Sequence, residues 1–107
     1  MTQGEGLLIA VEQWHVTNWA TLVGHRISTS VRPRSTNRSK NSVSIEFQTD
    51  EWAVSAVVWD SGETEVLTAS KIDLTAVPAV AVHTVTSPED VAALLDGIRD
   101  DLLPEPC

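Results

Sequence analysis

The sequence has one cysteine, no tyrosine and no long apolar run, and these absences exclude several classes of protein. Cys107 is the last residue, so the chain can form neither an internal disulfide nor a metal cluster built from cysteines. No run of 18 apolar residues occurs, and the apolar stretch 7–11 is followed at once by Glu12, so no membrane-spanning helix is expected. This stretch also lacks the preceding basic residues and the cleavage site of a signal peptide. We therefore expect a cytoplasmic protein.

Sequence motifs for catalysis or cofactor binding are missing as well. The three histidines, His15, His25 and His83, are scattered, and none forms a pair at the spacing that directs two rings to one metal ion. The five glycines form no phosphate-binding loop and no G-x-S-x-G nucleophile motif. Cys107 is a poor nucleophile because the nearby Glu105 disfavours its thiolate. The sequence therefore predicts no enzymatic activity, no cofactor and no metal site.

Charge is abundant and unevenly distributed along the chain. The net charge is −8, which divides into +3 over residues 1–45 and −11 over residues 46–107. An acidic half repels phosphate backbones and attracts basic proteins. The basic segment 32–41 is hydrophilic and has no aromatic residue that could stack on a base, so we interpret it as a flexible loop and expect no nucleic-acid binding. The alternative is that the acidic charge only keeps a small domain soluble.

Length and hydrophobic patterning predict one domain over residues 1–107, with 104–107 as a tail. A chain of 107 residues that is 42% hydrophobic can build one modest core. Apolar spacing over 7–23 favours a helix that Gly24 ends in a left-handed conformation, with a strand as the alternative because several residues are β-branched. A second helix follows Ser87, which suits the N-cap, with Pro88 at the first position and Asp90 completing an approximate capping box.

The chain between the two helices alternates in the manner of β-strands. The polar connection 49–51 and the turn Asp60–Ser61–Gly62 indicate antiparallel hairpins, and Pro78 marks a break before the last strand. Residues 52–59 are apolar on both faces, which is typical of a central strand. We predict an α+β fold in which both helices pack on one face of an antiparallel sheet of about five strands, over 25–32, 42–48, 52–59, 63–69 and 80–85.

Tryptophans and acidic residues are the candidates for a binding surface. We interpret all four tryptophans as core residues, with Trp59 partly exposed because it ends its strand beside a turn, where it could anchor an interface. Asp100 and Asp101 occupy the last turn of the second helix, where the helix dipole disfavours acids, which suggests that their charge is used. The alternative for the hairpin acids is that they are ordinary solvated turn residues. The hypothesis is a surface for a basic protein partner made by Trp59, Asp60, Glu63, Glu65, Asp96, Asp100 and Asp101.

Three segments, SVSIEFQTD, AVSAVVWDSGETEVL and TSPEDVAALLDGI, together with a tryptophan-containing N-terminal helix, resemble the TriTu family of bacterial immunity proteins. The resemblance covers about residues 42–100, and the chain departs from the family in the loop 32–41 and in LTAVPAVAV. It implies an α+β fold, a cytoplasmic location, no enzymatic activity, and neutralisation of an ADP-ribosyltransferase toxin that modifies elongation factor Tu. The family's binding residues would correspond to Trp59, Asp60, Gly62 and Glu63, for which a structural role is the alternative.

The sequence therefore predicts an immunity protein that binds a basic toxin and occludes its active site or its substrate face. It needs no cofactor and binds neither nucleic acid nor membrane. A non-enzymatic interaction or regulatory domain is the alternative, because the same acidic surface would serve that function.

Overall fold

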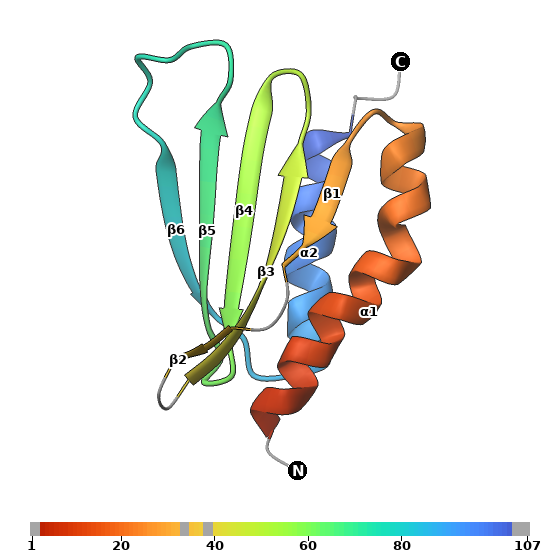
Figure 1. The fold of residues 1–107 in the computed structure, drawn as a ribbon, viewed down its shortest axis with the longest axis vertical. Helices are drawn as coiled ribbons and strands as arrows, with labels where there is room; N and C mark the ends of the chain where they lie inside the picture. Colours follow the sequence, from red (N-terminus) through yellow and green to blue (C-terminus); the bar gives the residue numbers. More distant parts are fainter. Residues whose placement is uncertain (1–2, 33–34, 38–39, 104–107) are drawn as a thin grey trace.

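The computed structural model describes residues 3–32, 35–37 and 40–103, which form a sheet with two helices against it (Figure 1). The predicted α+β fold, with a helix at each end and an antiparallel sheet between them, is confirmed. In chain order the elements are α1 (Gln3–Gly24), β1 (Ser28–Val31), β2 (Ser35–Asn37), β3 (Lys40–Gln48), β4 (Trp52–Trp59), β5 (Glu63–Ser70), β6 (Ala79–Thr84) and α2 (Pro88–Leu102).

All neighbouring strands of the sheet are antiparallel, and five of the strands lie in the order β1-β3-β4-β5-β6. β4 is the central strand of this row, as its two apolar faces predict. The connection after β3 is fixed by Thr49, whose Oγ1 accepts hydrogen bonds from the main-chain N–H groups of Glu51 (3.1 Å) and Trp52 (2.9 Å). Both predicted hairpins, through 49–51 and 60–62, are confirmed.

The prediction of a loop over 32–41 is wrong for part of that segment. Ser35–Asn37 form the short strand β2, which pairs with the beginning of β3 from Lys40 to Ser42. Residues 33, 34, 38 and 39 lie outside the described residues. The segment was predicted as a loop because it has no apolar side chains to bury. A pair of strands, however, needs only main-chain hydrogen-bond partners, and β3 provides these partners for β2.

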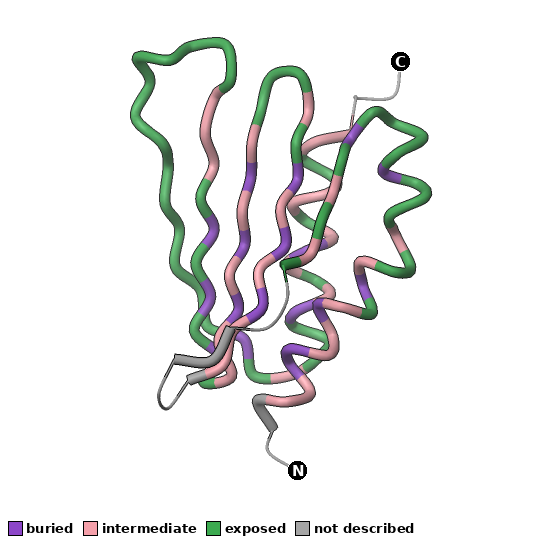
Figure 2. The backbone as a smooth tube through the Cα atoms, in the orientation of Figure 1, coloured by how far each residue is buried: buried purple, intermediate pink, exposed green. Residues whose placement is uncertain are grey.

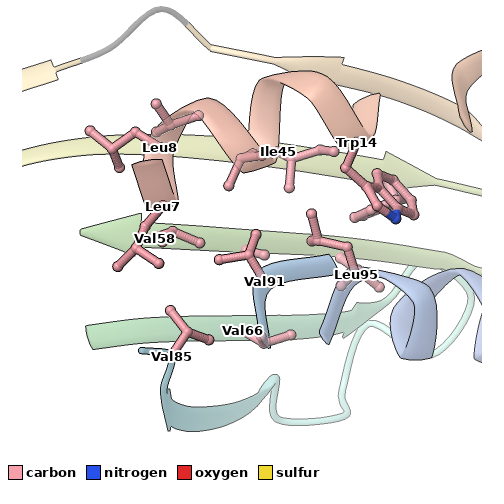
Figure 3. Packing of buried hydrophobic residues seen from close by; sticks show 14 of the residues in the cluster. Leu7, Leu8, Trp14, Ile45, Val58, Val66, Val85, Val91 and Leu95 are labelled. Atoms are coloured by element: carbon pink, nitrogen blue, oxygen red, sulfur yellow. The ribbon is translucent and has the colours of Figure 1, made fainter. Parts of the chain in front are cut away.

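The core lies between the sheet and the helices, because alternate residues of each strand point to the same face. Figure 2 shows the resulting alternation along these strands, of buried and intermediate positions in β3 and β4 and of buried and exposed positions in the first half of β5. Trp14 of α1 packs edge-on against Phe47, with ring centroids 5.7 Å apart. Figure 3 shows Val91 and Leu95 of α2 directed toward the strands. The buried strand residues on this face are Val43, Ile45, Phe47, Val54, Ala56, Val58, Thr64 and Val66.

α1 ends at Gly24, as predicted, but the left-handed residue that ends it is Arg26, with φ 62°. The Ile27 N–H donates to the Leu22 carbonyl (2.9 Å) and the Arg26 N–H to the Val23 carbonyl (3.0 Å). These two bonds form a Schellman motif in which the buried Ile27 supplies the usual apolar contact. The expectation that Gly24 itself adopts the left-handed conformation is therefore wrong.

α2 begins as the sequence predicts. Ser87 is the N-cap, its Oγ accepts from the Asp90 N–H (3.2 Å), and Pro88 occupies the first turn. The Asp90 carboxylate accepts from the N–H (3.0 Å) and the Oγ1–H (2.8 Å) of Thr86, the residue before the N-cap. Side chains of Ser87 and Asp90 therefore bind main-chain N–H groups on both sides of the helix start.

The helix layer is displaced toward the β1 edge of the sheet. Figure 1 shows α1 beside β1 and α2 behind β1 and β3, with β5 and β6 on the side of the sheet away from the helices. All six residues of β6 are exposed. The sheet is therefore wider than the layer that covers it, and this offset creates the surfaces described next.

Candidate functional site

The four hairpin residues of the hypothesised surface lie at the β4–β5 turn and on the sheet face away from the helices. Trp59 is half-buried on that face, so its partial exposure is confirmed. Glu65 lies between Val57 of β4 and Val82 of β6, and Glu63 lies opposite Thr84. Asp60, also half-buried, accepts a hydrogen bond from the Asn41 N–H (3.2 Å), which attaches the turn to β3.

The three acids of α2 have different surroundings. Asp96 faces α1, where its Oδ1 accepts a hydrogen bond from the indole Nε1 of Trp14 (2.9 Å) and lies 3.3 Å from an Arg99 nitrogen. Asp100 is ion-paired with Arg99 (3.1 Å). Asp101 is exposed and lines two hollows of the surface that Trp52 also lines. Asp96 therefore joins the two helices, whereas Asp101 faces outward.

The structure does not gather these seven residues on one surface. Figure 1 places the β4–β5 turn at the lower end of the sheet and the last turn of α2 at its upper end. Glu63 and Glu65 point away from the helices, and the α2 acids belong to the helix layer. A binding role for each residue stays a prediction, but one continuous surface made by all seven is not present.

Two of the four tryptophans are not core residues. Trp14 is buried, as predicted, but the side chains of Trp19 and Trp52 are 50% and 42% exposed. Trp19 lies on the solvent side of α1. Trp52 is on the helix-facing side of the sheet, but it is the first residue of β4, at the end of the sheet where the helix layer stops. Their burial was predicted from the large apolar area of the indole ring. That area does not determine whether another part of the fold covers the ring, and here the cover is incomplete.

A groove of about 570 Å³ runs between α2 and the uncovered half of the sheet. Its sides come from the half-buried apolar flank of α2, including Leu94, Ile98 and Leu102, and from strand residues that include Trp52 and Val66. Asp101 and His83 are its ionisable residues. We call this hollow the α2 groove. It lies where β4, β5 and β6 extend beyond α2.

A second feature, at the same uncovered edge of the sheet, is a concentration of exposed apolar side chains. Of the ten large hydrophobic residues that are exposed among those described, six lie on β5, β6 and the connection between them. The connection is ordered locally, because Asp73 accepts hydrogen bonds from the Thr75 N–H (3.1 Å) and Oγ1–H (2.6 Å). These bonds lower the pKa of Asp73. We call this set the β6 surface: Leu67, Ile72, Leu74, Val77, Val80 and Val82.

The sequence interpretation missed the β6 surface and the α2 groove. The signal for the first was available, since the segment VPAVAV has apolar residues at both odd and even positions of what was predicted as the last strand. An edge strand with apolar residues on both faces cannot bury both. The groove has no such signal, because it depends on where the helices lie across the sheet.

Other kinds of site find no support in the described part of the chain. Neither helix is both long and apolar enough to cross a membrane. Within residues 3–32, 35–37 and 40–103, no three side chains of histidine, cysteine, aspartate or glutamate group together as metal ligands would. The α2 groove is lined mostly by apolar side chains, which suits contact with an apolar group of a ligand or a partner.

No protein-family model, no curated protein and no solved structure matches the chain. The resemblance to the TriTu family therefore stays a prediction that rests on the segments quoted above. The fold and the surfaces define an α+β domain with a one-sided helix layer and an uncovered apolar sheet edge.

Proposed function

We propose that the protein is an immunity protein, which binds a cognate toxin through the β6 surface and the α2 groove and blocks the toxin by covering it. The observation that carries this proposal is the concentration of exposed apolar side chains on β5, β6 and their connection, at the edge of the sheet that the helices leave uncovered. Exposed apolar patches of this kind are typical of protein-binding sites. Trp52, an aromatic side chain of the kind that dominates binding energy at interfaces, lies on the helix-facing side of the sheet, where it lines the α2 groove.

Charge supports a basic partner. Glu63 and Glu65 border the β6 surface on the sheet face away from the helices, and Asp101 borders the α2 groove. With a net charge of −8, the chain attracts a positively charged protein from a distance and speeds its association. Apolar contacts at the centre then slow its dissociation. The predicted toxin surface is therefore basic around an apolar centre.

The identity of the toxin as an ADP-ribosyltransferase acting on elongation factor Tu comes from the family resemblance. In this proposal the chain contributes no reacting group and no cofactor, and inhibition depends on occupancy of the toxin surface. It follows that inhibition is stoichiometric and is reversed only when the complex dissociates.

The test is an assay of the toxin domain encoded beside this chain, with elongation factor Tu and labelled NAD. The expected result is that transfer of label to the factor falls linearly as the chain is added and stops near one chain per toxin. Full transfer in the presence of excess chain contradicts the proposal. A complex that forms without loss of transfer supports the alternative function, an interaction or regulatory domain.

A further inference from the structure

β6 is an unprotected edge of the sheet. It pairs with β5 along one side, and no described strand pairs with its other side. Edge strands are usually guarded against pairing by charged residues, prolines or bulges. Residues Ala79–Thr84 contain no lysine, arginine, aspartate or glutamate and no proline, and the register with β5 continues from Thr84 to Ala79 without a bulge. This edge can therefore accept another strand.

The hydrogen-bonding pattern identifies which main-chain groups of β6 are free to pair. The Val85 N–H donates to the Gly62 carbonyl (2.9 Å), so Val85 and Gly62 form a hydrogen-bonded pair. In an antiparallel ladder these pairs alternate, so the main-chain groups of Ala79, Ala81 and His83 point to β5. The N–H and C=O groups of Val80, Val82 and Thr84 point outward.

The opposite edge of the sheet is protected in ways that β6 is not. β1 has only four residues, and α1 packs against it. Arg32, which follows β1, is ion-paired with Glu46 of β3 at 2.7 Å. A short strand next to a helix and an ion pair is a typical guarded edge. The difference between the two edges indicates that the exposure of β6 serves binding.

Both faces beside β6 select the side chains of an added strand. On the open face, Glu65 lies next to Val82 and Glu63 next to Thr84, so an added strand would place its residues about 10 Å from these acids, within reach of lysine or arginine. On the other face, the added side chains would lie beside His83 and Ala81 at the open side of the α2 groove, where large apolar groups fit. The preferred strand therefore alternates basic and apolar residues.

We propose that β6 binds an extended segment of the partner as an additional strand, in which basic and apolar side chains alternate. The proposal rests on the proposed function, because it describes how the basic toxin is held. A second copy of this chain fits less well. Its β6 would present Ala79, Ala81 and His83 to the groove, and the alanines are too small to fill it. It would also bring a second net charge of −8.

The experiment measures the affinity of the toxin domain encoded beside this chain for three forms of the chain. Val82→Pro removes an outward N–H that β5 does not use, so the sheet keeps its own hydrogen bonds. Val82→Ile is the matched control, since it keeps the N–H, the β-branched shape and the apolar side chain. We expect Val82→Pro to bind about tenfold or more weakly, and Val82→Ile to bind within about twofold of the original chain. Circular dichroism and unfolding in urea confirm that both variants are folded.

The possible outcomes separate this inference from the proposed function. If the original chain binds the toxin and Val82→Pro binds equally well, strand addition at β6 is wrong and the immunity function stands. If the original chain does not bind the toxin at all, the proposed function fails and this inference fails with it. Light scattering tests whether a second copy of this chain occupies the edge instead. If the original chain is a dimer and Val82→Pro is a monomer, β6 pairs with a second copy and the proposal is overturned.

Discussion

The indole Nε1 of Trp14 donates a 2.9 Å hydrogen bond to the carboxylate of Asp96, and this bond joins the two helices across 82 residues of sequence. Arg99 extends the contact, because it donates to Asn18 of α1 (3.0 Å) and lies 3.3 Å from Asp96. Asn18 in turn donates to the Trp14 carbonyl (2.9 Å). Asp96 therefore holds the helix layer together, although the sequence suggested that it binds a partner.

Replacement of Asp96 tests this structural role. We expect Asp96→Ala to lower the free energy of unfolding by about 1–2 kcal/mol, because the indole N–H and Arg99 both lose an acceptor. Asp96→Asn keeps an acceptor oxygen and should lose about half as much. Unfolding in urea, followed by tryptophan fluorescence, gives both values. If Asp96→Ala is as stable as the original chain but binds the toxin more weakly, Asp96 is a binding residue and not a structural one.

Gly62 is the position where the turn chemistry is strictest. Its φ is +94°, and a Cβ at this position would clash with the carbonyl oxygen of Val85, the residue whose N–H bonds to the Gly62 carbonyl. We expect Gly62→Ala to cost about 3 kcal/mol, since backbone strain and the clash add. Gly97→Ala is the control, because a Cβ there meets nothing within 4 Å and alanine favours a helix by up to about 1 kcal/mol. Equal melting temperatures for the two variants would contradict this account.

The fold was predictable from the sequence because each element has a strong local signal. β3 alternates apolar and polar residues, and β4 is apolar on both faces. The sequence Asp60–Ser61–Gly62 is typical of a turn, and Ser87 is typical of the N-cap of a helix. These signals depend on residues near one another in the chain. The strand β2 has none, because only its pairing with β3 makes it a strand.

The candidate site was less predictable, because it depends on how the layers are placed. The sequence shows that Trp52 shares a face of β4 with Val54, Ala56 and Val58, but not that α2 leaves it partly exposed. Similarly, Asp96 and Asp101 are five residues apart on one helix, and only the position of α1 makes the first structural and leaves the second exposed. The uncharged last strand could have been identified as an exposed edge, since its apolar residues occupy both faces.

The start of α2 predicts a pH dependence of stability. The main-chain N–H of Thr86, and then its hydroxyl, lower the pKa of Asp90 below 3.8 in the folded chain. Because the folded pKa is the lower one, the ionised carboxylate stabilises the fold above the unfolded pKa, and this contribution is lost as the pH falls through the folded pKa.

Unfolding in urea at several pH values checks this for Asp90. The stability difference between the original chain and Asp90→Asn should be constant from about pH 7 to pH 5 and should shrink below about pH 4. Thr86→Ser keeps both donors and should follow the original chain. A difference that persists unchanged at pH 3 would show that the charge of Asp90 is not responsible.

Trp52 and Trp19 form a matched pair for locating the binding surface. Both side chains are about half exposed, but only Trp52 lines the α2 groove. We expect Trp52→Leu to weaken toxin binding about tenfold or more, and Trp19→Leu to change it by less than about twofold. Isothermal titration calorimetry measures both affinities. If Trp19→Leu weakens toxin binding more than Trp52→Leu does, the toxin binds the solvent side of α1 and not the α2 groove.

The central claim is that a toxin binds the side of the fold that the helix layer leaves uncovered, and hydrogen–deuterium exchange with and without toxin tests it most directly. The account predicts that the complex slows exchange of the outward amides of Val80, Val82 and Thr84 and of the last turns of α2. The amides around Trp19 on α1 should exchange at the same rate in both states. Slower exchange confined to α1, with β6 unchanged, would contradict the account.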